Sequence, residues 1–155
     1  MLSRGDYVLC NFPLRESSGP GPSPHVVLCA ATGRKGDTDF AIVFYTTFQT
    51  DYHGARRPRQ YLLVNKARAE ELGQKVAFQV DASRIARWPL TPDYFPEMAG
   101  DTLPLRGHDP DFVGKVEERL RELIANGFEI TRVDAVIRKP KQGFAWIAPP
   151  MPEID

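Results

Sequence analysis

The chain has 155 residues, of which 42% are hydrophobic, and this is enough for one hydrophobic core. Its 20 Lys and Arg residues balance its 20 Asp and Glu residues, so no overall field draws it to nucleic acid or to an acidic membrane. No segment approaches the roughly 18 apolar residues of a membrane span and no secretory signal opens the chain, so we expect a cytoplasmic protein without a membrane partner.

The first half of the chain contains β-prone runs that are separated by turn-forming residues. The predicted strands are residues 7–12, 26–30 and 40–45. The Gly/Pro/Ser-rich segment 14–23 has no apolar side chain after Leu14, so we expect a mobile loop there, and residues 33–37 are predicted to form a turn. Strands at this spacing favour a small barrel or sandwich.

The two cysteines, Cys10 and Cys29, each lie in one of these apolar runs. Because no secretory signal is present, we expect them to be small core residues rather than a disulfide. The three histidines are scattered and have no close cysteine partner, so the sequence predicts no structural zinc site and no other cofactor.

The middle of the chain alternates between loops and short elements. Residues 48–60 are predicted to be a long polar loop that leads into a strand over 61–64. Asn65 is placed to cap a short helix over 67–72, with Gly73 just beyond its end. Two further strands are predicted, 76–80 and 83–88, followed by an irregular proline-rich segment over 89–110.

A helix over 109–126 is the clearest prediction from local pattern. Asp109 is the expected N-cap, Pro110 occupies the first helical position, and Gly127 ends the run. One face is apolar and should dock on the core: Phe112, Val116, Leu120, Leu123 and Ile124. After Gly127, two β-prone runs on either side of residues 140–143 suggest a C-terminal hairpin.

The order of these segments resembles the MazF/PemK toxin family. The similarity lies in "RGDYVLCNFPL", a Gly/Pro loop, "SPHVVLCAATG" and "FAIVFYTTFQ", and continues in "FQVDASRIARWPLTPDYF", covering roughly residues 3–126. The resemblance implies a mainly β fold, a small SH3-like antiparallel β-barrel with a C-terminal helix. The barrel domain would then cover residues 1–138, and residues 139–155 would be a C-terminal extension.

The same resemblance implies a function. Members of the family are homodimeric, metal-independent endoribonucleases that cut single-stranded RNA, and a small antitoxin protein neutralises them. Apolar loop residues such as Phe48 and Tyr52, together with exposed strand edges, are features that a dimer partner would cover.

The family's catalytic residues are an Arg at a strand entry and a Thr at the end of the next strand. By position, the Thr corresponds to Thr46, with Thr47 as the alternative, and the Arg corresponds to Ser23. Serine supplies neither positive charge nor acid/base chemistry at neutral pH. His25 is two residues from Ser23 and therefore on the same side of an extended strand, which makes it the best placed acid/base group. The alternative is that Pro24 and His25 only form the entrance of a hairpin.

A second candidate site lies in the loop after the predicted catalytic strand. Arg56, Arg57 and Arg59, with Tyr52 and His53 nearby, have the residue types that clamp phosphates and stack unpaired bases. The alternative is a solvated charged loop.

The sequence leaves three functional hypotheses. The leading hypothesis is an endoribonuclease toxin, and the second is a catalytically silent relative that still binds RNA or a protein. The third, a toxin of the same fold that binds a protein such as DNA gyrase, has no supporting pattern at the end of the chain.

Overall fold

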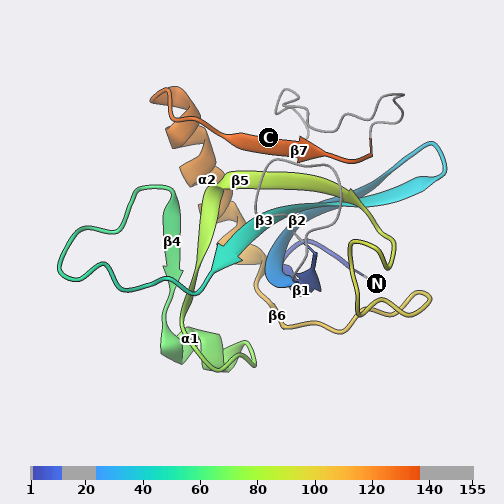
Figure 1. Cartoon of the computed structure of the whole chain (residues 1–155), viewed down its shortest axis with the longest axis horizontal. Helices are drawn as coiled ribbons and strands as arrows, with labels where there is room; N and C mark the ends of the chain where they lie inside the picture. Colours follow the sequence, from blue (N-terminus) through green and yellow to red (C-terminus); the bar gives the residue numbers. More distant parts are fainter. Residues whose placement is uncertain (1, 12–23, 137–155) are drawn as a thin grey trace.

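The computed structural model in Figure 1 describes residues 2–11 and 24–136. Several predictions fall outside these residues: the mobile loop over 14–23, Ser23, the second arm of the C-terminal hairpin and the extension over 139–155.

The described fold is mainly β, as the sequence predicted. The strands are β1 (Asp6–Cys10), β2 (His25–Lys35), β3 (Thr38–Thr47), β4 (Tyr61–Val64), β5 (Phe78–Pro89), β6 (Gly107–His108) and β7 (Thr131–Asp134). They form a sheet in the order β4-β5-β3-β2-β1-β6, in which neighbouring strands are antiparallel, and β7 pairs in parallel with β5. The sheet curls into a half-barrel (Figure 1).

Three details of the strand prediction were wrong. The turn predicted over 33–37 is confined to Gly36 and Asp37, because Gly33 continues β2 and its lack of a side chain makes room for the Phe40 ring. The predicted strands over 76–80 and 83–88 are one continuous strand, β5. The irregular segment over 89–110 contains the short strand β6, which pairs with β1.

The pairing of β3 with β5 is interrupted in the middle. Phe44 lies opposite Ile85, but the next residue, Tyr45, lies opposite Asp81. Residues 82–84 therefore have no partner on β3 and form a bulge, which bends a strand and changes the direction of its side chains. On its other edge, β5 pairs with β4 before the bulge and with β7 after it.

Both helices begin and end where local signals predicted. Helix α1 (Lys66–Glu71) is capped by the side chain of Asn65, and α2 (Pro110–Ala125) by the side chain of Asp109. Gly73 and Gly127, which follow the two helices, have φ values of 92° and 76°, in the left-handed region that glycine adopts most easily.

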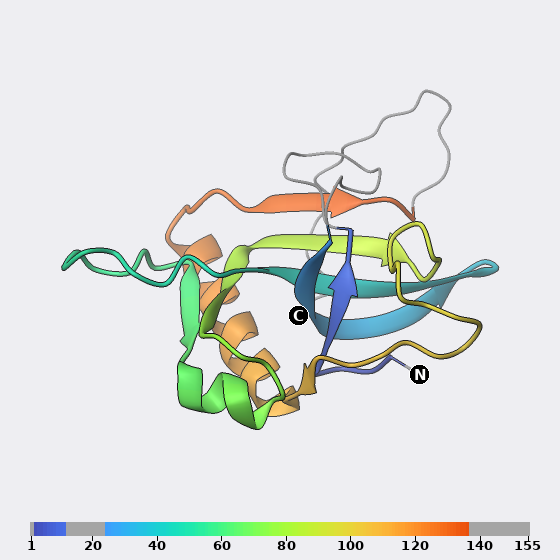
Figure 2. The same cartoon turned by 60° about the horizontal axis from the view of Figure 1, so that its bottom comes forward.

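Helix α2 packs where the sheet turns between β5 and β4 (Figure 2). Its buried residues are Val113, Val116, Leu120 and Leu123. The sequence wrongly placed Ile124 on the buried face: it is 39% exposed, because the buried stripe runs to Leu123 in the last turn and the next residue is rotated about 100° around the helix, away from the sheet.

The sheet has a hydrophobic cluster on each side. The cluster beneath α2 includes Tyr7, Leu28, Phe44, Phe78 and Leu120. The opposite cluster includes Val27, Val43, Trp88 and Phe95. Cys10 and Cys29 are free buried thiols in this second cluster, as predicted, and burial raises the pKa of each well above its ordinary value. Hydrophobic side chains thus cover both faces of the sheet over much of their length, so buried polar residues on either face are unusual.

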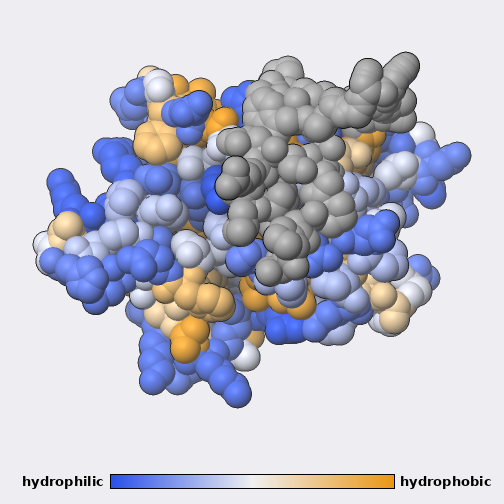
Figure 3. Space-filling model, viewed as in Figure 1, coloured by the Kyte–Doolittle hydropathy of each residue, from blue (hydrophilic) through white to orange (hydrophobic). Residues whose placement is uncertain are grey.

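On the face shown in Figure 3, hydrophobic areas are separated by hydrophilic ones. Among the described residues the exposed large hydrophobic side chains are scattered: Leu63 is on β4, Ile124 is on α2, and Phe48, Val76, Leu105 and Phe128 are in the connections between elements. The loop between β3 and β4, which projects at the left of this view, has a mainly hydrophilic surface.

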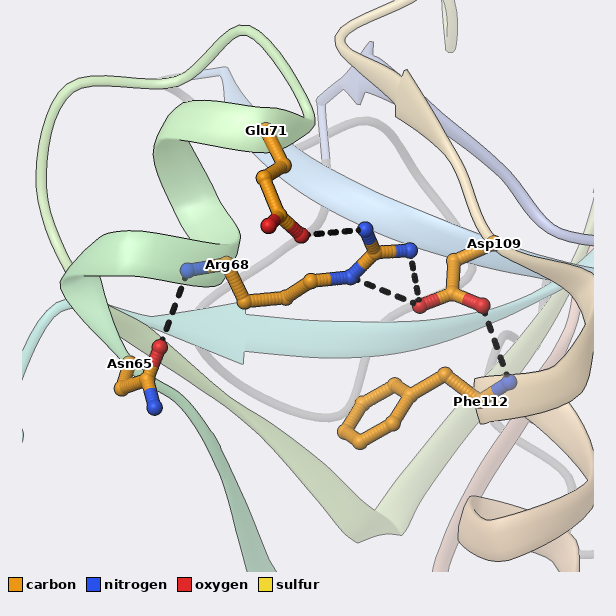
Figure 4. A network of polar contacts seen from close by, with 5 residues as sticks. All are labelled: Asn65, Arg68, Glu71, Asp109 and Phe112. Atoms are coloured by element: carbon orange, nitrogen blue, oxygen red, sulfur yellow. Dashed lines mark hydrogen bonds and ion pairs between the residues drawn. The ribbon is translucent and has the colours of Figure 1, made fainter.

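A polar network joins the two helices (Figure 4). Asp109 accepts a hydrogen bond from the Phe112 backbone N–H at 3.3 Å, and its other oxygen accepts two from Arg68, at 2.8 and 3.3 Å. Arg68 also pairs with Glu71 at 2.8 Å. Asp109 therefore caps α2 and ties it to α1.

We expect Asp109→Ala to lower the free energy of unfolding by about 0.5–2 kcal/mol, the cost of losing an N-cap. Asp109→Asn is the matched control: it retains a capping oxygen but loses the charge that faces Arg68, and should fall between wild type and Asp109→Ala. Urea denaturation measures all three. Equal midpoints for Asp109→Ala and wild type would show that the cap contributes nothing.

Candidate functional site

A polar strip crosses one face of the sheet at the β5 bulge. Residues that lie directly opposite one another on paired strands point to the same face. Val27, Tyr45, Asp81 and Tyr61 therefore form one row across β2, β3, β5 and β4. On β3, β5 and β4, Thr47, Gln79 and Leu63 form the next row.

His25 lies at the β2 end of this strip. Its ring contacts the Tyr45 ring, with centroids 5.3 Å apart, and the Arg84 guanidinium carbon lies 4.3 Å from the centroid of the same ring. Burial and the positive charge of Arg84 lower the pKa of His25 from its ordinary value. The imidazole of His25 and the guanidinium of Arg84 thus both contact the Tyr45 ring.

Asp81 lies on the other side of Tyr45 and is only 4% exposed. Its Oδ1 accepts hydrogen bonds from the backbone N–H and the hydroxyl of Ser83, at 2.9 and 2.6 Å. Burial raises the pKa of Asp81, although the bonds from Ser83 and the charge of Arg84 oppose the shift. The pKa of Tyr61 is also raised, by burial and then by the carboxyl of Asp81.

The β4 end of the strip is aromatic and cationic. Tyr52 stacks on Tyr61, with centroids 6.4 Å apart and an interplanar angle of 27°. Arg57 lies over the Tyr52 ring at 5.6 Å and donates to the buried Gln79 side chain and to the Thr50 carbonyl. Gln79 in turn donates to the Tyr52 hydroxyl at 2.5 Å. These bonds fix the base of the loop against the strip.

The three loop arginines line one groove, together with β4 and α2. The groove has a volume of 760 Å³ and is lined by Arg56, Arg57, Pro58, Arg59, Tyr61, Leu62, Leu63, Phe112, Arg119 and Glu122. Arg119 donates to the Arg59 carbonyl at 2.5 Å, and Arg59 faces Glu122 at 3.5 Å. Tyr61 lines this groove and also belongs to the first row of the strip.

The two candidate threonines differ in their surroundings. Thr46 is 5% exposed and its hydroxyl donates to the Val26 carbonyl at 2.5 Å, so that its only proton is already in a hydrogen bond. Thr47 is half-buried and lies on the same face as Tyr45, because side chains alternate along a strand. The structure therefore brings Thr47, rather than Thr46, to the strip with His25.

His53 does not join this site. It is exposed at the tip of the 48–60 loop, with φ 52°, and its partner there is Asp51.

Sequence reasoning missed Tyr45, Tyr61, Asp81 and Arg84. The signal that was available is "DASR", a polar segment inside an otherwise apolar β-prone run. Such an interruption is consistent with a bulge, but only the pairing with β3 and β4 shows which face its side chains occupy.

Comparison with known proteins gives no family assignment: no family model and no curated protein matches the sequence. Within the described residues, no group of three or more His, Cys, Asp or Glu side chains is arranged to hold a metal ion. None of the helices in residues 2–11 and 24–136 has the length and apolar character needed to cross a membrane.

We expect Thr46→Val to lower the free energy of unfolding by about 1–3 kcal/mol, because it removes the donor to the Val26 carbonyl at a buried site while keeping the side-chain shape. Thr47→Val, one residue away, is the matched control and should change stability by less than about 0.5 kcal/mol. Thermal denaturation measures both variants. If the two were equally destabilised, the Thr46 hydrogen bond would have no special weight.

Proposed function

We propose that this protein is a metal-independent endoribonuclease that acts on single-stranded RNA at the polar strip. The observation that carries the proposal is the placement of the His25 imidazole and the Arg84 guanidinium against the same Tyr45 ring. An acid/base group next to a fixed positive charge is what phosphoryl transfer needs in the absence of a metal.

The chemistry follows from RNA's own nucleophile. The 2′-hydroxyl attacks the adjacent phosphorus, the bond to the 5′-oxygen breaks, and the products are a 2′,3′-cyclic phosphate and a 5′-hydroxyl. Arg84 supplies positive charge beside the pentacoordinate phosphorus, where negative charge increases in the transition state. His25, which changes charge near neutral pH, moves a proton.

The groove next to the strip supports a single-stranded substrate. Tyr52 and Tyr61 offer stacked rings on which unpaired bases can lie. Tyr61 also lines the groove, to which Arg56, Arg57 and Arg59 bring positive charge. Base stacking of this kind is largely independent of sequence and requires bases that are not paired.

The remaining parts of the proposal come from the resemblance to MazF/PemK toxins. They are an SH3-like barrel of that type, a two-fold homodimer, a small antitoxin protein as partner and a cytoplasmic location. Light scattering at micromolar concentration tests whether the protein is a dimer, since a monomeric mass would exclude the homodimer.

A catalytically silent RNA-binding protein is the second candidate. It is favoured by Ser23, which stands where the family has its catalytic Arg, and by the hydrogen bond that occupies the Thr46 hydroxyl. Ser23→Arg distinguishes the candidates: if wild type binds RNA without cleaving it and this variant cleaves, the silent protein is the correct reading.

We expect the triple variant Arg56→Ala, Arg57→Ala and Arg59→Ala to bind single-stranded RNA more weakly and with a smaller salt dependence. Each lost phosphate contact should reduce the slope of log K against log salt by about 0.7. The double variant Arg34→Ala and Lys35→Ala, at the exposed end of the β2–β3 hairpin, is the control and should retain the wild-type slope. An unchanged affinity and slope in the triple variant would make the loop a solvated surface only.

We expect cleavage to persist in EDTA and to yield cyclic phosphate ends. His25→Ala should reduce the rate by about 10²–10⁴, the usual effect of losing an acid or base, while RNA binding persists. Because burial and Arg84 lower the pKa of His25, its limb of the pH–rate profile should lie below the ordinary histidine value of about 6.5. A His25→Ala protein with full activity would contradict the site assignment.

A further inference from the structure

We propose that the α2 side of the groove holds a second phosphate of the RNA between Arg59 and Arg119, and that Glu122 takes the place of this phosphate in the free protein. The inference rests on the proposed function and extends it away from the phosphate that is cleaved. It adds Arg119 and Glu122 to the residues that set the affinity for RNA, and it makes Glu122 an internal competitor of the substrate.

The groove follows a free edge of the sheet. Strand β4 is the first in the sheet order, and among the described residues it pairs only with β5. Three consecutive residues of β4, Tyr61, Leu62 and Leu63, line the groove, although neighbouring side chains on a strand point to opposite faces. The groove therefore runs along the edge of β4, with the polar strip on the Tyr61 face and α2 on the Leu62 face. An RNA strand that crosses the strip can continue over this edge to α2.

One carboxylate oxygen in the groove faces two guanidiniums. Oε1 of Glu122 lies 3.5 Å from an Nη atom of Arg59 and 3.6 Å from Nε of Arg119. Arg119 also donates to the Arg59 carbonyl at 2.5 Å, which holds its guanidinium in the groove. The place between the two guanidiniums is thus suited to one anion, and a side chain of the protein itself lies there.

The contacts of Glu122 are too long to be strong hydrogen bonds. Charge-assisted bonds between a guanidinium and a carboxylate are usually about 2.7–2.9 Å long. Glu117, on the same helix, makes such a pair with Arg4 through two bonds of 2.7 and 2.8 Å. Glu122 is half exposed, and exposed ion pairs contribute little to stability. An anionic ligand can therefore displace Glu122 at small cost.

A phosphodiester suits this place better than the carboxylate. It has two non-bridging oxygens, one for each guanidinium, whereas Glu122 presents the same oxygen to both. Phe112 and Tyr61 line the same groove and offer aromatic surface to the bases on either side of the phosphate. Arg56 and Arg57 add positive charge, so the groove favours an anionic strand over a neutral ligand.

The test measures binding of a single-stranded oligonucleotide of about ten nucleotides, whose 2′-hydroxyls are all methylated so that it cannot be cleaved. We expect Glu122→Gln to bind it about two- to fivefold more tightly than wild type, because the phosphate no longer competes with a carboxylate. Arg119→Ala should bind it more weakly by a similar factor. The slope of log K against log salt should fall by about 0.7 in Arg119→Ala, the loss of one phosphate contact.

The direction of the Glu122 effect separates this proposal from a structural role. If Glu122 only held Arg59 and Arg119 in position, its removal would loosen both side chains and weaken binding. Tighter binding by Glu122→Gln cannot result from misfolding. In the double variant that also carries Arg119→Ala, the gain should be smaller than in Glu122→Gln alone, because half of the phosphate site is absent.

Two variants on the same helix are matched controls. Glu118→Gln and Arg121→Ala make the same changes of charge at exposed positions that do not line the groove, and both should bind the oligonucleotide as wild type does. Cleavable RNA supplies a further control. Glu122→Gln should lower KM and leave kcat unchanged, because the second phosphate is not the one that reacts.

The outcomes distinguish this inference from the proposed function. If wild type cleaves RNA and both Glu122→Gln and Arg119→Ala bind as wild type does, the second phosphate site is wrong and the proposed function stands. An equal gain in affinity from Glu118→Gln and Glu122→Gln would reduce the effect to overall charge and overturn the site. If wild type binds the oligonucleotide but cleaves no RNA, the endoribonuclease proposal fails, and the binding measurements still decide the site.

An extended acidic peptide is the other class of ligand that the edge of β4 could accept, by adding a strand to the sheet. An oligoglutamate peptide is the probe for this alternative. If wild type binds the peptide and not the oligonucleotide, and Arg119→Ala weakens binding of the peptide, the groove is a peptide site and the phosphate site is overturned.

Discussion

The break in the pairing between β3 and β5 sets the curvature of the sheet and the position of the polar strip on it. Because residues 82–84 have no partner on β3, β5 bends, and its two halves pair with different strands on the outer edge. The bend lets a single sheet curl around α2 without a second sheet to close it. It also brings Asp81 and Arg84 to a face that is otherwise filled by Val27, Val43 and Trp88.

This arrangement has an energetic cost in the place where the function is proposed. A carboxyl that is 4% exposed loses most of its hydration, and the two bonds from Ser83 compensate for only one of its oxygens. Residues that merely completed a core would be apolar here, as Ala86 and Trp88 are further along the same strand. Polar residues that violate local preference at one place in a fold are typical of functional sites.

How much could be predicted from the sequence depended on whether the signal was local. The ends of α2 follow from Asp109, Pro110 and Gly127, which act within one turn of the helix, and the prediction was right to a residue or two. The bulge, the parallel pairing of β7 and the short strand β6 depend on partners distant in sequence. Nothing in the local pattern of residues 78–89 says that Tyr45 meets Asp81 and not Ser83.

The threonines show the same limit at the scale of one residue. The resemblance locates the catalytic threonine to within one residue of the sequence. Neighbouring residues on a strand face opposite sides of the sheet, so a shift of one residue places the side chain in an entirely different environment. Thr46 is a buried donor to Val26, whereas Thr47 lies on the face of Tyr45 and Gln79. The same alternation predicted His25, because it is two residues from Ser23 in the sequence. The contact of His25 with the Tyr45 ring puts it on the face that carries Arg84. For sites built on strands, the face a residue occupies is therefore a stronger criterion than its aligned position, and here it selects His25, Arg84 and Asp81 together.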